Sequence, residues 1–147
     1  MRRIGLGFEF EVPDTWLESR EGSRFVYEGG SQELLTISGA VIEGIGDASE
    51  LEVIRRQLFD GAVRAVSAAA ANPELRTVKP LSKESTTDGV DCWTIHSETE
   101  GREIMLSQAI CTAPRGVLVI TFEAANEADA LAAYRRFLGS VKIAAHA

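Results

Sequence analysis

The sequence lacks the features of a membrane-spanning or secreted protein. Its apolar runs all fall short of the about 20 residues that a helix needs to cross a bilayer, so we expect no direct membrane insertion. Its start, Met1–Gly5, leads into alternating sequence without the apolar centre of a signal peptide. Two cysteines in 147 residues are too few to staple a small secreted scaffold. These absences predict a cytoplasmic protein whose cysteines are buried thiols.

Positive charge is also scarce. The net charge is −7 and the pI is about 4.9, and the arginines come in scattered pairs such as Arg55-Arg56 and Arg135-Arg136. An acidic chain without a basic stripe repels phosphate backbones, so we expect no nucleic-acid partner. The composition is otherwise ordinary, with 45% hydrophobic residues, which fits a single domain over residues 1–147.

The potential metal ligands are badly spaced. Cys92, His96 and Cys111 offer suitable side chains, but residues four apart in a strand are separated by about 13 Å. A zinc ion holds each ligand at about 2.0–2.3 Å. Cys92 and His96 therefore cannot share one ion within an intact strand, and we expect no metal site.

Cofactor and catalytic motifs are missing as well. The stretch Gly44-Ile45-Gly46 lacks the third glycine of a dinucleotide-binding loop, and Asp47 and Glu50 place negative charge where a pyrophosphate would bind. The chain has only two histidines and no Gly-x-Ser-x-Gly sequence. We therefore expect no cofactor, no catalytic residue and no enzymatic activity.

The first pattern that the sequence does contain is a series of predicted strands before residue 44. In the stretch Gly7–Val12, phenylalanines alternate with Glu9 and Glu11, which predicts a strand with one buried face and one solvated face. Further strands are predicted at Arg24–Glu28 and Leu34–Glu43.

A long amphipathic helix is predicted over Glu50–Ala71. Asp47 and Glu50 suit a capping box at its start. Gly61 lies in its middle, where glycine costs about 1 kcal/mol relative to alanine, so we expect another element to approach the helix closely there. The apolar stripe follows helical spacing: Leu51, Ile54, Leu58, Ala62 and Ala65.

The remainder predicts a meander followed by a second helix, Glu127–Leu138, and a short strand at Val141–Ile143. Together these patterns predict an α+β domain in which an antiparallel meander of about six strands is flanked by two main helices. The meander strands are Leu75–Thr86, Cys92–Thr99, Ile104–Thr112 and Val117–Glu123.

Turn residues between the meander strands predict their register. Asp88-Gly89, Gly101-Arg102 and Pro114-Arg115-Gly116 are hairpin turns. They pair residues across neighbouring strands as follows: Lys79 with Glu98, Cys92 with Cys111, Ile95 with Gln108, His96 with Ser107, Gln108 with Thr121 and Ala109 with Ile120.

Both faces of this sheet are largely apolar, although only two helices are available to cover them. We therefore expect a homodimer or a bound partner to cover the surplus. Gln57 and Gln108 interrupt apolar surfaces, and a buried amide needs hydrogen-bond partners. Each glutamine is either a satisfied core or rim residue or a contact for a partner.

Three stretches of this sequence resemble the DcrB-like family, which has the PsbP-like fold. They are Pro13-Asp14-Thr15-Trp16, Arg56-Gln57-Leu58 and the stretch Glu100–Gln108. Within the family, the chain is most similar to Eag-type chaperones of type VI secretion effectors. The resemblance implies a cytoplasmic homodimer that shields the hydrophobic N-terminal segment of a secreted effector. An alternative is a DcrB-like protein-binding domain whose role is unrelated to secretion.

The resemblance also implies which residues bind the client. Family groove glutamines correspond to Gln57 and Gln108, and the groove strands correspond to the region of Phe25 and Ile37. With Trp93 and Ile95, which share the predicted sheet face of Gln108, the six residues are Phe25, Ile37, Gln57, Trp93, Ile95 and Gln108.

Overall fold

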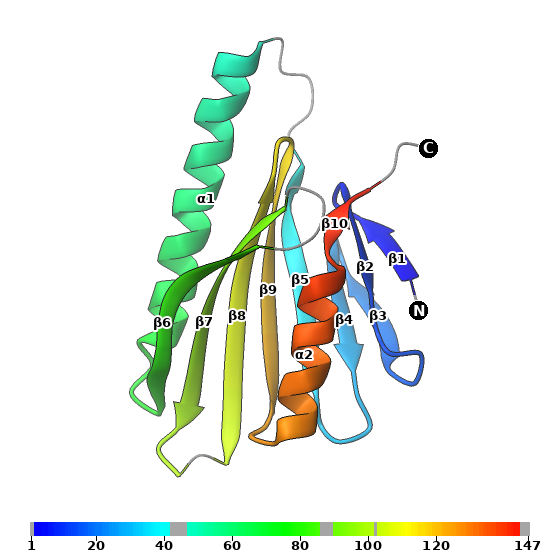
Figure 1. Ribbon diagram of the computed structural model, residues 1–147, viewed down its shortest axis with the longest axis vertical. Helices are drawn as coiled ribbons and strands as arrows, with labels where there is room; N and C mark the ends of the chain where they lie inside the picture. The colour runs from blue at the N-terminus through cyan, green and yellow to red at the C-terminus, as the bar shows by residue number, and fades with distance from the viewer. Residues whose placement is uncertain (1, 42–46, 86–89, 102, 145–147) are drawn as a thin grey trace.

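The computed structural model of the chain describes residues 2–41, 47–85, 90–101 and 103–144. Two helices and two antiparallel sheets make up this part of the chain (Figure 1). In chain order the elements are β1 (Arg2–Gly5), β2 (Phe8–Glu11), β3 (Leu17–Glu21), β4 (Arg24–Glu28), β5 (Leu34–Val41), α1 (Ala48–Ala70), β6 (Leu75–Ser85), β7 (Asp91–Thr99), β8 (Ile104–Ala113), β9 (Gly116–Ala125), α2 (Ala128–Ser140) and β10 (Lys142–Ile143).

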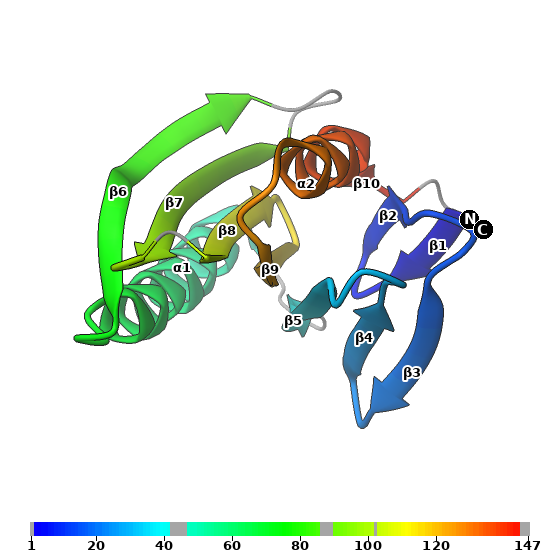
Figure 2. The ribbon, with the colours of Figure 1, turned by 90° about the horizontal axis from the view of Figure 1, so that it is seen from below.

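The main sheet has seven strands in the order β3-β4-β5-β9-β8-β7-β6, and a smaller sheet has the order β1-β2-β10. The two helices lie on opposite faces of the main sheet (Figure 2). The predicted α+β class, antiparallel meander and two flanking helices are therefore confirmed. The strands β1 and β3 were not predicted, because β1 is short and every residue of β3 is exposed, so neither alternates between apolar and polar side chains.

The register predicted from the turns is confirmed from β7 to β9. Cys92 pairs with Cys111 and His96 with Ser107, and Gln108 lies between Ile95 and Thr121. The pairing of Lys79 with Glu98 is wrong, because Lys79 pairs with His96. The ladder is already one residue away from the predicted register beside the turn, where Ser85 pairs with Asp91, and register shifts on both sides of Lys79 displace it further. The turn Asp88-Gly89, the stretch Gly44-Ile45-Gly46 and Arg102 lie outside the described residues.

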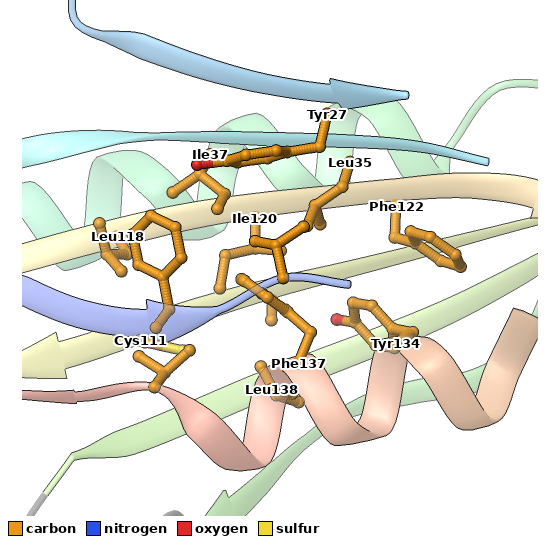
Figure 3. Close-up of a cluster of buried hydrophobic side chains, with 14 of the residues drawn as sticks. Tyr27, Leu35, Ile37, Cys111, Leu118, Ile120, Phe122, Tyr134, Phe137 and Leu138 are labelled. Atoms are coloured by element: carbon orange, nitrogen blue, oxygen red, sulfur yellow. The ribbon is translucent and has the colours of Figure 1, made fainter. Parts of the chain in front are cut away.

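The main core lies between the sheet and α2 (Figure 3). Phe122 of β9 is sandwiched between two aromatic rings, with Trp16 at 6.0 Å and Tyr134 at 5.2 Å between ring centroids. Phe10 of β2 packs edge-on against Phe137 of α2 at 5.8 Å, which attaches the small sheet to the same core. Rings in such arrangements stabilise a core beyond the area that they bury.

The cysteines depart from the predicted free thiols. Cys92 and Cys111, directly opposite each other on β7 and β8, are joined by a disulfide that spans 19 residues of sequence. Both residues are fully buried in the α2-side core. The register that brings them together was predicted, and the bond between them was not, because a reducing compartment had been assumed.

Glu9 also departs from prediction, since it was placed on a solvated face together with Glu11. Glu11 is exposed, but Glu9 is only 2% exposed. The reason is that β2 is the central strand of the small sheet, with β1 on one side and β10 on the other. The carboxylate of Glu9 forms an ion pair with Arg2 of β1, which offsets the cost of burying its charge.

A candidate binding surface beside helix α1

Helix α1 begins as its sequence predicts. The Asp47 carboxylate accepts a hydrogen bond from the backbone N–H of Glu50 at 2.9 Å, which satisfies one of the free donors of the first turn. The helix then lies across the sheet face opposite to α2 (Figure 2). Such a long helix needs an apolar stripe against the sheet to stay attached.

The contact between α1 and the sheet is small. Of the described side chains of α1, only Ala62 and Val66 are buried, and they pack on Ile110 and Val117 of β8 and β9. At the margin, the Phe59 ring lies 4.6 Å from the Trp93 ring of β7. The remaining apolar side chains at this contact are only partly buried: Leu58, Val63, Ile95 and Val119.

Gln108 lies beneath α1 rather than on an open surface. It is 5% exposed, and its Oε1 has no hydrogen-bond partner among the described residues. A buried acceptor without a partner costs about 1–3 kcal/mol. Trp93 and Ile95 are partly buried on the same face, so a client could reach all three residues only after displacement of α1.

The other predicted contact residues are split between different places. Phe25 is 3% and Ile37 0% exposed, and both belong to the α2-side core. The prediction that Phe25 and Ile37 share one surface with Trp93 and Gln108 is therefore wrong. Successive side chains of a strand point to opposite faces of the sheet, and the side chains of Phe25 and Ile37 point to the face away from α1. Gln57 is exposed on α1. The structure thus does not bring the six residues together.

The sheet face on the α1 side nevertheless remains open beyond the helix. Alternate residues of β5 and β9 point to this face, since Ser38 pairs with Val119 and Thr36 with Thr121, next to Ile110 and Gln108 on β8. These residues of β5 and β9 are partly exposed, whereas Ile110 and Gln108 on β8 are buried. We call this set the open strip: Thr36, Ser38, Ala40, Val119 and Thr121. Helix α1 packs mainly on β8 and β9, while β5, β4 and β3 extend past it in Figure 2.

The two flanks of α1 differ in charge. The contact between Phe59 and Trp93 directs one flank toward β7. That flank carries Glu52, which accepts hydrogen bonds from Arg55 at 2.6 and 3.1 Å, and this bonding lowers the pKa of Glu52. Helical geometry puts the opposite flank toward β9 and the open strip. We call four uncharged residues on that side the uncharged flank: Ile54, Leu58, Gly61 and Ala65. The guanidinium of Arg64 borders this flank at Gly61, and Gln57 lies closer to the outward side of the helix.

Gly61 was predicted to mark a close approach to the helix, and no described part of the chain makes one. A Cβ atom built on Gly61 would meet only the Arg64 Nη2 atom, at 3.9 Å, besides the backbone of its own helix. The glycine therefore leaves an empty notch on the uncharged flank of α1. Sequence reasoning found Gln57 and Gly61 but missed the open strip, whose threonine and serine residues give no apolar signal.

A hydrogen-bonded chain on the opposite sheet face superficially resembles a catalytic relay. His96 Nδ1 lies 2.8 Å from Ser107 Oγ, and His96 Nε2 lies 3.3 Å from Glu98 Oε1. Ser107 is only 2% exposed, and its strand lies between β7 and β9, so nearby backbone N–H groups donate within the sheet.

The described side chains include no group of three or more His, Cys, Asp or Glu residues that could hold a metal ion. Neither of the helices, as far as their residues are described, has the length and apolarity that crossing a membrane would require.

Comparisons with known proteins identify the fold. CyanoP, the cyanobacterial PsbP of Synechocystis sp. PCC 6803, superposes with a TM-score of 0.59 at 13% identity, over 94% of this chain and 87% of CyanoP. The fold is PsbP-like. LpqN, a Mycobacterium tuberculosis protein involved in cell envelope biogenesis, matches with a TM-score of 0.50 at 17% identity, over 94% of this chain and 83% of LpqN.

A Bacteroides thetaiotaomicron protein matches with a TM-score of 0.56 at 16% identity over 95% of this chain, which spans only 46% of that protein. No family model matches the sequence, and no curated protein matches it either. At these identities the likeness establishes the PsbP-like fold alone.

Proposed function

We propose that the chain is a non-catalytic protein-binding domain that receives an apolar helix of a partner protein along the open strip beside α1. The observation that carries this proposal is the notch at Gly61, bordered by the guanidinium of Arg64, on a helix that leaves a strip of small side chains on the same sheet face partly exposed. Small residues let a second helix approach closely. A preformed groove on a rigid sheet also lowers the entropic cost of binding.

The dimensions suit a short helix. The uncharged flank from Ile54 to Ala65 rises by about 16 Å, which corresponds to about three turns of a partner helix. Apolar contacts would come from Ile54, Leu58 and Val119. The exposed amide of Gln57 would hydrogen-bond a polar side chain or a free carbonyl of the bound helix.

The more specific form of the proposal is an Eag-type chaperone. In this form, the partner is the hydrophobic N-terminal segment of a type VI secretion effector, bound in the cytoplasm before export by a homodimer. The resemblance of Arg56-Gln57-Leu58 and Glu100–Gln108 to the DcrB-like family supports it. Gln57 is exposed on α1 and accessible to a client, whereas Gln108 would reach a client only if α1 shifts. Sedimentation velocity tests the homodimer, which a strictly monomeric species would contradict.

The disulfide favours the second candidate, a DcrB-like protein-binding domain unrelated to secretion. Disulfides persist in oxidising compartments and are reduced in the cytosol, so the Cys92–Cys111 bond suits a protein outside the cytosol. The thiol state in cells separates the two candidates. Rapid acid quenching followed by thiol labelling should show free cysteines for the chaperone and none for the alternative.

The decisive test of the shared proposal is capture of a neighbouring gene's product by co-expression, repeated with variants of the groove. Gly61→Leu would fill the notch and should reduce capture at least about tenfold, because a helix could no longer approach. Val53→Asp is the matched control, since Val53 is an exposed apolar residue on the outward side of the same helix. Equal loss in both variants, or none in Gly61→Leu, would contradict the proposal.

A further inference from the structure

A separate pocket lies on the other face of the sheet, between α2 and the strands β6, β7 and β8. Its volume is about 170 Å³. Figure 1 shows β6 bending across this face toward α2, so the pocket has the helix on one side and the bent strand on the other. An apolar cavity of about 150 Å³ is large enough to hold benzene, so the space corresponds to one aromatic ring or a chain of about six carbons.

The walls of the pocket are apolar. Leu131 and Leu138 come from α2, one of them partly and the other fully buried, and Val78 of β6 is 46% exposed at the outer wall. The ring of Tyr134 also lines this space. Such walls bind the hydrocarbon body of a ligand without directing its orientation.

The polar groups of the pocket are gathered on the sheet. Thr94 and Ser107 are buried, and the Ser107 hydroxyl is hydrogen-bonded to His96 at 2.8 Å. The other ring nitrogen of His96, Nε2, is 3.3 Å from the carboxylate oxygen Oε1 of Glu98. Glu98 does not line the pocket. The floor is therefore polar, and the Ser107 hydroxyl and both ring nitrogens of His96 are already hydrogen-bonded within the protein.

Among the described side chains that line this pocket, the guanidinium of Arg135, an exposed residue of α2, carries the formal charge. A guanidinium matches a carboxylate with two parallel hydrogen bonds. An apolar body beside a single cation selects for a ligand that carries one negative charge on a small hydrocarbon.

We propose that this pocket binds a small monocarboxylic acid with one aromatic ring or about six carbons, its carboxylate on Arg135 and its body between Leu131, Leu138 and Val78. The site is independent of the partner surface beside α1, because the two lie on opposite faces of the sheet.

Titration of the full chain with benzoate and with hexanoate tests the proposal, followed by two-dimensional NMR of the backbone amides. We expect saturable binding in the millimolar range, with the largest shifts at Thr94, Ser107 and Leu131. Benzyl alcohol and 1-hexanol, which have hydrocarbon bodies of similar size and no charge, should bind at least about tenfold more weakly.

Two adjacent arginines provide the matched variants. Arg135→Gln should weaken benzoate binding about tenfold or more, because it removes the charge-assisted hydrogen bonds. Arg136→Gln should leave binding unchanged, since Arg136 lines a different groove near Glu11 and Asp14. Both side chains are exposed, so both variants should fold, which thermal melting verifies.

Leu131→Trp, which fills the pocket, should abolish binding with the melting temperature retained. The proposal is overturned if neither acid saturates a site, if the neutral analogues bind as well as the acids, or if Arg135→Gln and Arg136→Gln behave alike.

Discussion

The two faces of the main sheet are covered in different ways by their helices. Helix α2 has 13 residues and buries Ala130, Tyr134, Phe137 and Leu138 in a continuous aromatic core. Helix α1 has 23 residues, yet Ala62 and Val66 are its only buried side chains among those described. The α2 face therefore holds the fold together. The α1 face keeps partly exposed side chains that the helix does not cover, and for this reason we place the partner there.

The largest effect should come from the closed face. Phe122→Ala removes a ring that is stacked between Trp16 and Tyr134 and should cost about 3–5 kcal/mol in the free energy of unfolding. Urea denaturation followed by far-UV circular dichroism measures it. A loss below about 1 kcal/mol would mean that the α2 face is not the main core.

The next largest effect should come from the disulfide on the same face. A cross-link over 19 residues restricts the unfolded chain, and reduction should destabilise the protein by about 3 kcal/mol. Comparing urea midpoints with and without dithiothreitol measures this. The Cys92→Ala/Cys111→Ala double variant is the control, and it should not respond to dithiothreitol. An identical midpoint under both conditions for the natural chain would show that the cysteines do not cross-link.

Truncation on the α1 face should have a smaller effect. Phe59→Ala removes the contact with the Trp93 ring but not a fully enclosed side chain, so we expect about 1–2 kcal/mol. The intrinsic fluorescence of the tryptophans would report the local change. A cost equal to that of Phe122→Ala would remove the contrast between the two faces.

The smallest effects concern the two glutamines. Gln108→Leu replaces an unpartnered buried oxygen with an apolar group of similar shape and should stabilise the fold by up to about 1 kcal/mol. Gln57→Ala should change stability by less than about 0.5 kcal/mol, because Gln57 is exposed. Destabilisation by Gln108→Leu would show that its amide has a structural partner.

The sequence predicts best those structural features that depend on residues close together in the chain. Turns at Gly101 and Pro114 set the register of β7, β8 and β9, and the predicted pairs there are confirmed. The β6 register was predicted wrongly, because the pairing is already one residue off beside the turn and the shifts inside the ladder, which leave no mark in the turn, move it further. Burial of Glu9 was missed for a similar reason, since it depends on β10 at the far end of the chain.

The candidate site was only partly predictable. Helical spacing identifies only part of the stripe of α1 that meets the sheet, since Ala62 is buried as predicted, whereas Ala65 is exposed and the buried Val66 was missed. It does not identify which strands the helix covers. Gln108 is therefore found beneath α1, and Phe25 and Ile37 in the opposite core. The open strip is visible only once β5 is known to lie beside β9, a pairing between segments far apart in the sequence.

The rate at which a single introduced thiol reacts with a maleimide tests most directly that the strip beside α1 is open. Because the disulfide occupies both natural cysteines, Ser38→Cys would carry the only reactive thiol. In the free, dilute protein it should react within about tenfold of Ser19→Cys, whose position on β3 is exposed. A rate as slow as that of Ser107→Cys, at a buried position, would show that the strip is covered and would contradict the account.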